Sequence, residues 1–143
     1  MRRNLRPEEL GDLLSRPLNG ILALHRADGS ILQTPIWHQW HGGVFRFQVP
    51  AGDRKIGMLE RDPRVSLIVA ENEHPYRAME VHGRALVTAD GYQEVGFAIV
   101  ERYVRAYDPT ASVEAYLSDA PGAIVTIHAD STRAWDYSDE AFV

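Results

Sequence analysis

The chain has 143 residues, 45% of them hydrophobic and 24% charged, and a formal net charge of −5, values typical of one globular domain with a core of its own. The negative charge excludes nucleic acid as the main partner, because binding a phosphate backbone requires a net or strongly local positive field. The chain contains no cysteine, which excludes disulfides, thiolate catalysis and thiolate-bound metals, so any catalysis depends on other groups or on a cofactor.

Neither a secretory signal nor a membrane span is expected. The basic start, Met1–Asn4, is not followed by the apolar segment of a signal peptide. No run approaches the roughly 18 apolar residues of a transmembrane helix. We therefore expect a cytoplasmic protein without a membrane partner.

The first forty residues predict a short helix followed by a β-hairpin. The segment Pro7–Pro17 begins with a proline and two glutamates and ends at a proline, the pattern of a short helix. Two strands follow, Leu18–His25 and Ile31–Trp40, joined by a turn with an Asp-Gly pair. Inside the second strand Pro35 lacks a backbone donor, which favours an edge, a bulge or a position where something other than a strand lies alongside.

The next segment predicts a strand and a helix joined by a basic loop. In the strand Val44–Val49, Arg46 and Gln48 share one face, which is either wet or lined by a ligand. The loop then brings Arg54 and Lys55, the only lysine of the chain, to the start of the helix. Free backbone N–H groups and the helix dipole attract anions there, so two adjacent cations indicate a phosphate site. A solvated charge pair entering a surface helix is the alternative.

The middle of the chain predicts two more strands and a longer helix. Pro63–Ala70 has a strong β pattern, and Tyr76–Thr88 reads as a strand bent around Gly83. A helix from Gly91 to Tyr107 follows, with Asp90 as its predicted cap.

The last part of the chain predicts a short helix, Ala111–Ser118, a strand, Ala123–His128, and a docked aromatic tail, Arg133–Tyr137. About six closely spaced strands interrupted by few helices favour an antiparallel barrel over a doubly wound sheet. We predict a mainly β (α+β) fold that forms a single domain over residues 1–143.

One sequence motif, Asp53–Leu67, resembles the corresponding segment of the pyridoxamine 5'-phosphate oxidase-like split β-barrel flavoproteins. Four further segments agree with this family in order and spacing: Gly20–Ser30, Thr34–Trp37, Pro75–Ala85 and Arg133–Tyr137. The resemblance implies a six-stranded antiparallel split β-barrel with peripheral helices. It also implies a homodimer that holds a flavin or deazaflavin cofactor at the subunit interface.

The resemblance assigns cofactor-binding roles to three groups of residues. An arginine–lysine pair binds the cofactor phosphate in oxidases of this family, and Arg54 and Lys55 match that pair. The end of the preceding strand would contribute Gln48 and Val49. The strand beside the ring system would contribute four consecutive residues, Thr34, Pro35, Ile36 and Trp37.

The sequence departs from the true vitamin oxidase. That enzyme has an arginine near the position of Thr34, a lysine near Gln39, and a longer C-terminal segment with substrate-binding arginine and histidine residues. Oxidation of pyridoxamine phosphate is therefore not expected. The motifs Thr34–Trp37 and Pro75–Gly83 are more similar to the deazaflavin (F-420) reductase branch, and the sequence leaves F-420 and FMN open as cofactors.

Other candidate sites are less informative. His38 and His41 fall on opposite strand faces and no carboxylate completes a set, so no metal site is expected. His82 is predicted to be a core histidine. Trp37 either belongs to the core or stacks near the cofactor ring.

These observations predict an oxidoreductase in which reduced F-420 or FMN transfers hydride to a small organic substrate. The catalytic residue stays unassigned, with Tyr76, His38 and bound water as the candidate proton donors. The alternative is a non-catalytic flavin, deazaflavin or haem binding or carrier protein on the same fold. A structural dimer with an empty groove is the third possibility.

Overall fold

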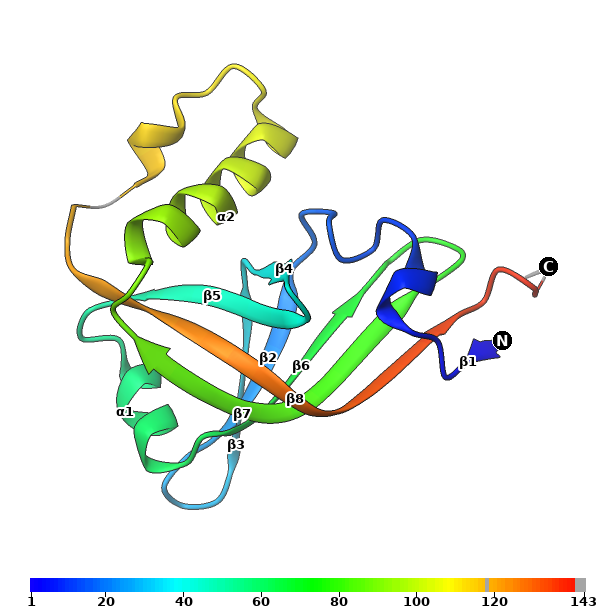
Figure 1. Cartoon of the computed structure of the whole chain (residues 1–143), viewed down its shortest axis with the longest axis horizontal. Helices are drawn as coiled ribbons and strands as arrows, with labels where there is room; N and C mark the ends of the chain where they lie inside the picture. The colour runs from blue at the N-terminus through cyan, green and yellow to red at the C-terminus, as the bar shows by residue number, and fades with distance from the viewer. Residues whose placement is uncertain (118, 141–143) are drawn as a thin grey trace.

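Eight strands form one antiparallel sheet that curls into a half-barrel (Figure 1), in a computed structural model that describes residues 1–117 and 119–140. Neighbouring strands follow the order β3-β2-β6-β7-β8-β5-β4, and β1 pairs with β8. Every pairing is antiparallel, which confirms the predicted split β-barrel. The strands are β1 (Arg2–Arg3), β2 (Gly20–His25), β3 (Ile31–Ile36), β4 (Gln39–His41), β5 (Val44–Pro50), β6 (Arg64–Ala70), β7 (Ala78–Thr88) and β8 (Gly122–Asp136).

All six predicted strands are present; four lie within two residues of their predicted bounds, and the other two differ more. The predicted strand Ile31–Trp40 is interrupted at residues 37–38, which separates β3 from β4. The last strand continues eight residues past His128 to Asp136, so most of the predicted aromatic tail belongs to β8. Its middle, from 128 to 133, is exposed, and polar residues outnumber apolar ones there, so this stretch lacks the apolar pattern that predicts a strand.

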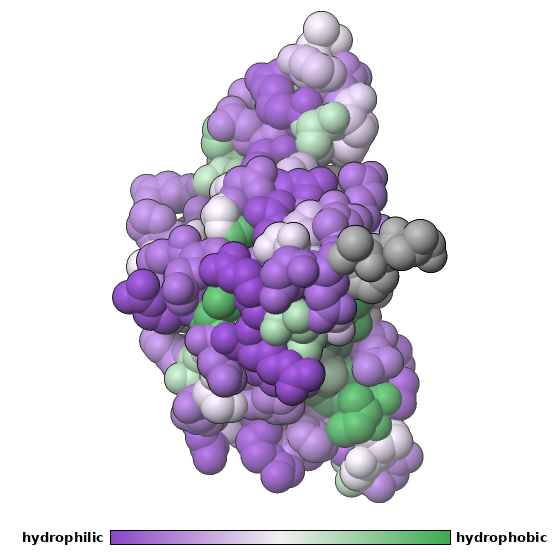
Figure 2. Space-filling model, turned by 90° about the vertical axis from the view of Figure 1, so that its right-hand side faces the viewer, coloured by the Kyte–Doolittle hydropathy of each residue, from purple (hydrophilic) through white to green (hydrophobic). Residues whose placement is uncertain are grey.

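The core lies inside the curled sheet, where the alternating apolar residues of the strands meet. In β5, Phe45, Phe47 and Val49 are buried while Arg46 and Gln48 are partly exposed, as predicted. Burying a side chain of this size contributes roughly 1.5–3 kcal/mol relative to leaving it exposed. Seen from one side, the surface is largely hydrophilic with small hydrophobic patches (Figure 2).

The predicted helix Pro7–Pro17 is wrong beyond its first turn. A 3-10 helix, η1 (Pro7–Leu10), ends at Gly11, where the backbone has a φ of 61° that L side chains rarely adopt. Turns follow, yet Leu10, Leu13 and Leu14 are still buried against the core. The apolar spacing was therefore a correct sign of burial and a poor sign of helix length.

Two α-helices lie outside the sheet (Figure 1): α1 (Arg54–Arg61) and α2 (Tyr92–Tyr107). Helix α2 packs over β5 and β8. Gly91, in a left-handed conformation, precedes α2, so the predicted capping role of Asp90 is wrong; the Asp90 N–H instead donates to the Thr88 hydroxyl. The predicted helix Ala111–Ser118 is represented by the short 3-10 helix η2 (Val113–Tyr116), and Ser118 lies outside the described residues.

The predicted bend at Gly83 is a register shift between β7 and β8. A Cβ at this position would lie 2.0 Å from the carbonyl oxygen of His128, so the close approach of the two backbones requires glycine. The preceding His82 is exposed and its Nε2 lies 3.1 Å from Glu80. The prediction of a core histidine is wrong, because His82 lies on the outer face of the sheet.

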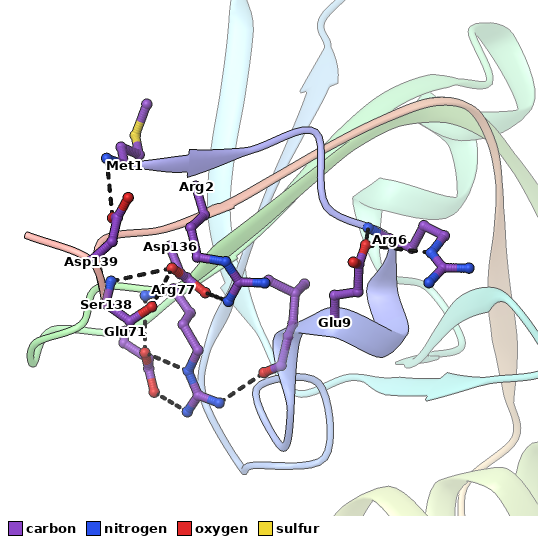
Figure 3. A network of polar contacts seen from close by, with 10 residues as sticks. Met1, Arg2, Arg6, Glu9, Glu71, Arg77, Asp136, Ser138 and Asp139 are labelled. Atoms are coloured by element: carbon purple, nitrogen blue, oxygen red, sulfur yellow. Dashed lines mark hydrogen bonds and ion pairs between the residues drawn. The ribbon is translucent and has the colours of Figure 1, made fainter.

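A buried carboxylate ties the N-terminal segment to the loop before β7 (Figure 3). Oε2 of Glu71 accepts hydrogen bonds from the backbone N–H and the Nε of Arg77, both at 2.9 Å. Arg77 also donates to the Leu10 carbonyl at 2.8 Å, and Arg16 forms an ion pair with the same carboxylate. The bonds from Arg77 hold the pKa of Glu71 below its ordinary value despite burial.

Candidate cofactor site

A hollow of about 270 Å³ lies where the ends of β3 and β5 meet the start of α1 and the middle of α2. It brings together most of the residues predicted to bind a cofactor, and it excludes two of them. Arg54 is exposed at the first position of α1. Thr34, in β3, is half-buried and lies opposite Leu22 of β2. The lining residues are Pro35, Ile36, Trp37, Phe47, Gln48, Val49, Pro50, Asp53, Lys55, Ile99 and Val100.

The polar end of the hollow is formed by Asp53 and Lys55. Asp53 caps α1, since its Oδ1 accepts a hydrogen bond from the Lys55 backbone N–H at 2.8 Å. The Lys55 ammonium lies 3.3 Å from Oδ1 and 3.2 Å from Oδ2 of the same carboxylate. The Asp53 carboxylate therefore lies beside the position at this helix N-terminus where a phosphate is expected. The side chains of Asp53 and Lys55 are each 21% exposed.

Most of the remaining lining of the hollow is apolar or aromatic. Trp37 lies at its rim with 36% of its surface exposed, and Ile99 and Val100 of α2 form the adjoining wall. The indole of Trp37 stacks on the ring of Tyr103, with centroids 4.8 Å apart and planes 7° from parallel. Trp37 therefore lies at the rim of the hollow, where its indole stacks on Tyr103, and is not a core residue.

Helix α2 approaches the hollow closely because it has a glycine at the contact. A Cβ at Gly96 would lie 1.9 Å from Oε1 of Gln48, so no larger residue fits without movement of one partner. The Gln48 side chain is consequently held between the hollow and the helix. Sequence reasoning missed Gly96, Ile99 and Val100, since nothing in the pattern of α2 shows which strand it covers.

His38 and Tyr76, the two side chains considered as proton donors, do not line the hollow. The ring of His38 is fully buried, edge-on to Phe45 at 5.3 Å between centroids. Burial, and after it the nearby positive charge of Arg102, lower the pKa of His38 to about 4. The imidazole is therefore neutral near pH 7 and belongs to the packing behind the site.

Within residues 1–117 and 119–140, no three His, Asp or Glu side chains are grouped so that they could hold a metal ion. Over the same residues, no helix combines the length and hydrophobicity of a transmembrane segment.

Comparisons with solved structures find the same fold in other proteins. An F420 reductase is 28% identical, with a TM-score of 0.72 over 89% of this chain and 98% of that chain. A conserved hypothetical protein of Mycobacterium tuberculosis is 23% identical, with a TM-score of 0.72 over 93% of this chain and 86% of that one. An FAD-binding protein of Mesorhizobium loti is 20% identical, with a TM-score of 0.66 over 93% and 95%.

Comparison with curated proteins finds no match. The family described as pyridoxamine 5'-phosphate oxidase matches residues 7–136, a span that includes the whole sheet except β1 and every residue lining the hollow. The chain therefore belongs to the pyridoxamine 5'-phosphate oxidase family of split β-barrel proteins.

Proposed function

We propose that the protein is an oxidoreductase that binds F-420 or FMN in this hollow and transfers hydride between the cofactor and a small organic substrate. The observation that carries the proposal is the lining of the hollow, which combines an ammonium with aromatic and aliphatic side chains. A phosphorylated flavin or deazaflavin has the same two parts, an anion and a planar ring. When bound, the cofactor supplies the hydride chemistry, and the protein binds, orients and shields it.

Lys55 would hold the phosphate at the polar end. Lys55 lines the hollow at the start of α1, where the helix dipole also favours an anion. The phosphate would compete with Asp53 for the Lys55 ammonium and weaken the present ion pair. The exposed Arg54, one position earlier on the same helix turn, would add a second positive charge.

The ring would lie toward Trp37, Ile99 and Val100. These side chains offer a flat aromatic surface and an aliphatic wall, which suit a planar ring system. Pro35 and Ile36 would flank the ring from the end of β3. Gln48 and Val49, at the end of β5, would contact the part of the cofactor between ring and phosphate, with the Gln48 amide as a hydrogen-bond partner.

A second copy of the chain would complete the site. The hollow, at about 270 Å³, is smaller than the roughly 300–1,000 Å³ of sites that enclose a ligand of this class. Ile21 lies directly opposite both Pro35 and Ile68, which places an apolar stripe across the outer faces of three strands. Because Pro35 belongs to the stripe and to the hollow, a homodimer that covers the stripe would also close the site.

The similarity to an F420 reductase favours the deazaflavin over FMN, because it extends over nearly the whole of that chain. The likeness to an FAD-binding protein, at 20% identity, supports the fold alone. We therefore place F-420 first among the cofactors to test.

One observation favours a second candidate, a flavin, deazaflavin or haem binding protein without turnover. Among the residues that the structure describes, Asp53 and Lys55 are the only titratable side chains that line the hollow, and they are paired with each other. A catalytic acid or base would then have to come from the substrate, from water or from a second subunit. Tight binding without reduction of any acceptor in a broad panel would support this candidate over the oxidoreductase.

The test is a titration of the purified protein with F-420 and, separately, with FMN, followed by quenching of tryptophan fluorescence. Lys55→Ala should weaken cofactor binding by about 1–3 kcal/mol, the scale of a charge-assisted contact. Arg3→Ala, which removes one positive charge from β1 at the opposite side of the molecule (Figure 1), is the control and should leave the affinity unchanged. Equal affinity of Lys55→Ala and the unmodified protein would contradict the proposed phosphate contact.

A further inference from the structure

Two neighbouring residues of α2, Arg102 and Tyr103, form hydrogen bonds to the backbone of the link between β3 and β4, which consists of Trp37 and His38. The His38 N–H donates to the Tyr103 hydroxyl at 3.1 Å, and this hydroxyl donates to the Leu18 carbonyl at 2.6 Å. The guanidinium of Arg102 donates to the His38 carbonyl. Both polar groups of the His38 backbone are thus satisfied by one turn of the helix, which explains why the strand is interrupted here.

The same tyrosine supports the side chain that precedes His38. Its ring is stacked on the Trp37 indole at 4.8 Å, and only 4% of Tyr103 is exposed. Burial raises the pKa of Tyr103, so its hydroxyl keeps its proton at neutral pH and remains a donor to Leu18. Tyr103 therefore contacts the link twice, through a hydroxyl at the backbone and a ring at the indole.

We propose that Tyr103, assisted by Arg102, is a positioning residue that holds the Trp37 indole as a fixed wall of the hollow. Its relevance to cofactor binding rests on the function proposed above. A tryptophan with 36% of its surface exposed would otherwise sample several rotamers. Ordering such a side chain on binding lowers affinity, so a wall that is already ordered raises it.

The experiment uses protein labelled with 5-fluorotryptophan, in which the three tryptophans give separate fluorine resonances. Trp37→Phe identifies the resonance of Trp37. Tyr103→Leu removes the stack and the hydroxyl, whereas Tyr103→Phe removes the hydroxyl alone. Tyr107→Leu is the matched control, because Tyr107 is an exposed tyrosine on the same helix.

In the free protein, Tyr103→Leu should shift or broaden the Trp37 resonance and leave that of Trp135 in place. Tyr103→Phe should give a smaller change of the same kind, and this variant decides the question if Tyr103→Leu does not fold. Tyr107→Leu should leave the Trp37 resonance unchanged. An unchanged Trp37 resonance in the Tyr103 variants would overturn the proposal.

The second measurement is the affinity of the same variants for F-420 and FMN. Tyr103→Leu should raise the dissociation constant about three- to tenfold relative to Tyr107→Leu. A displaced Trp37 with an unchanged dissociation constant would overturn the positioning role. If the unmodified protein binds neither cofactor, the proposed function fails, while the fluorine spectra of the free protein still decide whether Tyr103 holds Trp37.

Discussion

Lys55 contacts the Asp53 carboxylate through two of its groups: the lysine backbone N–H donates to Oδ1 at 2.8 Å, and its ammonium lies 3.3 Å from Oδ1 and 3.2 Å from Oδ2. The carboxylate therefore caps α1 and also neutralises the cation proposed to bind phosphate. Exchanging Asp53 for asparagine separates these two roles, since asparagine caps a helix about as well as aspartate but has no charge.

We expect Asp53→Asn to bind a phosphorylated cofactor more tightly than the unmodified protein, by about 0.5–1 kcal/mol, because Lys55 loses a competing anion. The stability of the fold should change little. The measurement is the fluorescence titration described above, with urea unfolding as the check on stability. Weaker binding by a stable Asp53→Asn protein would mean that Asp53 itself contacts the cofactor.

Gly96→Ala should destabilise the protein by about 1–3 kcal/mol, because the added methyl group would overlap Oε1 of Gln48. The measurement is urea unfolding. Gly57→Ala on α1 is the control: among the described residues, no atom beyond its chain neighbours and the adjoining helix backbone lies within 4 Å of its Cβ position, so this variant should be more stable by about 0.5–1 kcal/mol. Combining Gly96→Ala with Gln48→Ala should recover part of the loss, and independent effects would argue against the overlap.

Glu71→Gln should cost about 3 kcal/mol near pH 7, since it leaves Arg77 and Arg16 without their shared counter-charge. The folded state lowers the pKa of Glu71 below its ordinary 4.5, so the associated stability is present above that pH and disappears as the pH falls further. Urea unfolding between pH 7 and 3 should show a steeper loss for the unmodified protein than for Glu71→Gln. Parallel curves would contradict this account.

His38 should stay neutral through the range in which exposed histidines titrate. Its pKa is about 4 in the folded protein against 6.5 ordinarily, so the unfolded chain binds the extra proton first. The cost to stability therefore grows as the pH falls from about 6.5 to about 4 and then levels off. Proton NMR of the six histidines tests this directly, and a His38 resonance that titrates near pH 6.5 would contradict the described packing.

The strands were predictable because their alternating apolar residues reflect a property of each strand alone: one face in the core and one outside. Gly83 was predictable for a similar reason, since a glycine inside a β pattern indicates a bulge. The interruption at Trp37 and His38 was not, because Arg102 and Tyr103 cause it from a distant helix.

Only part of the candidate site was predictable: the residues from the strands and α1, but not those from α2. The resemblance placed Trp37, Gln48 and Lys55 together, and the hollow contains all three. The wall from α2 could not be foreseen, since helix periodicity shows which face is buried and not what it covers. Asp53 did leave a signal, an aspartate at the position of a helix cap, but its pairing with Lys55 depends on side-chain directions that the sequence does not specify.

The position of β8 has a consequence for the order of assembly. This strand lies between β5 and β7, and both neighbours precede it along the chain. Before residues 122–136 leave the ribosome, β5 and β7 each lack a partner along one edge, so nascent chains expose two unpaired strand edges. Completion of the sheet therefore waits for contacts between distant parts of the chain, and we expect folding on the slow, millisecond-to-second scale of such topologies.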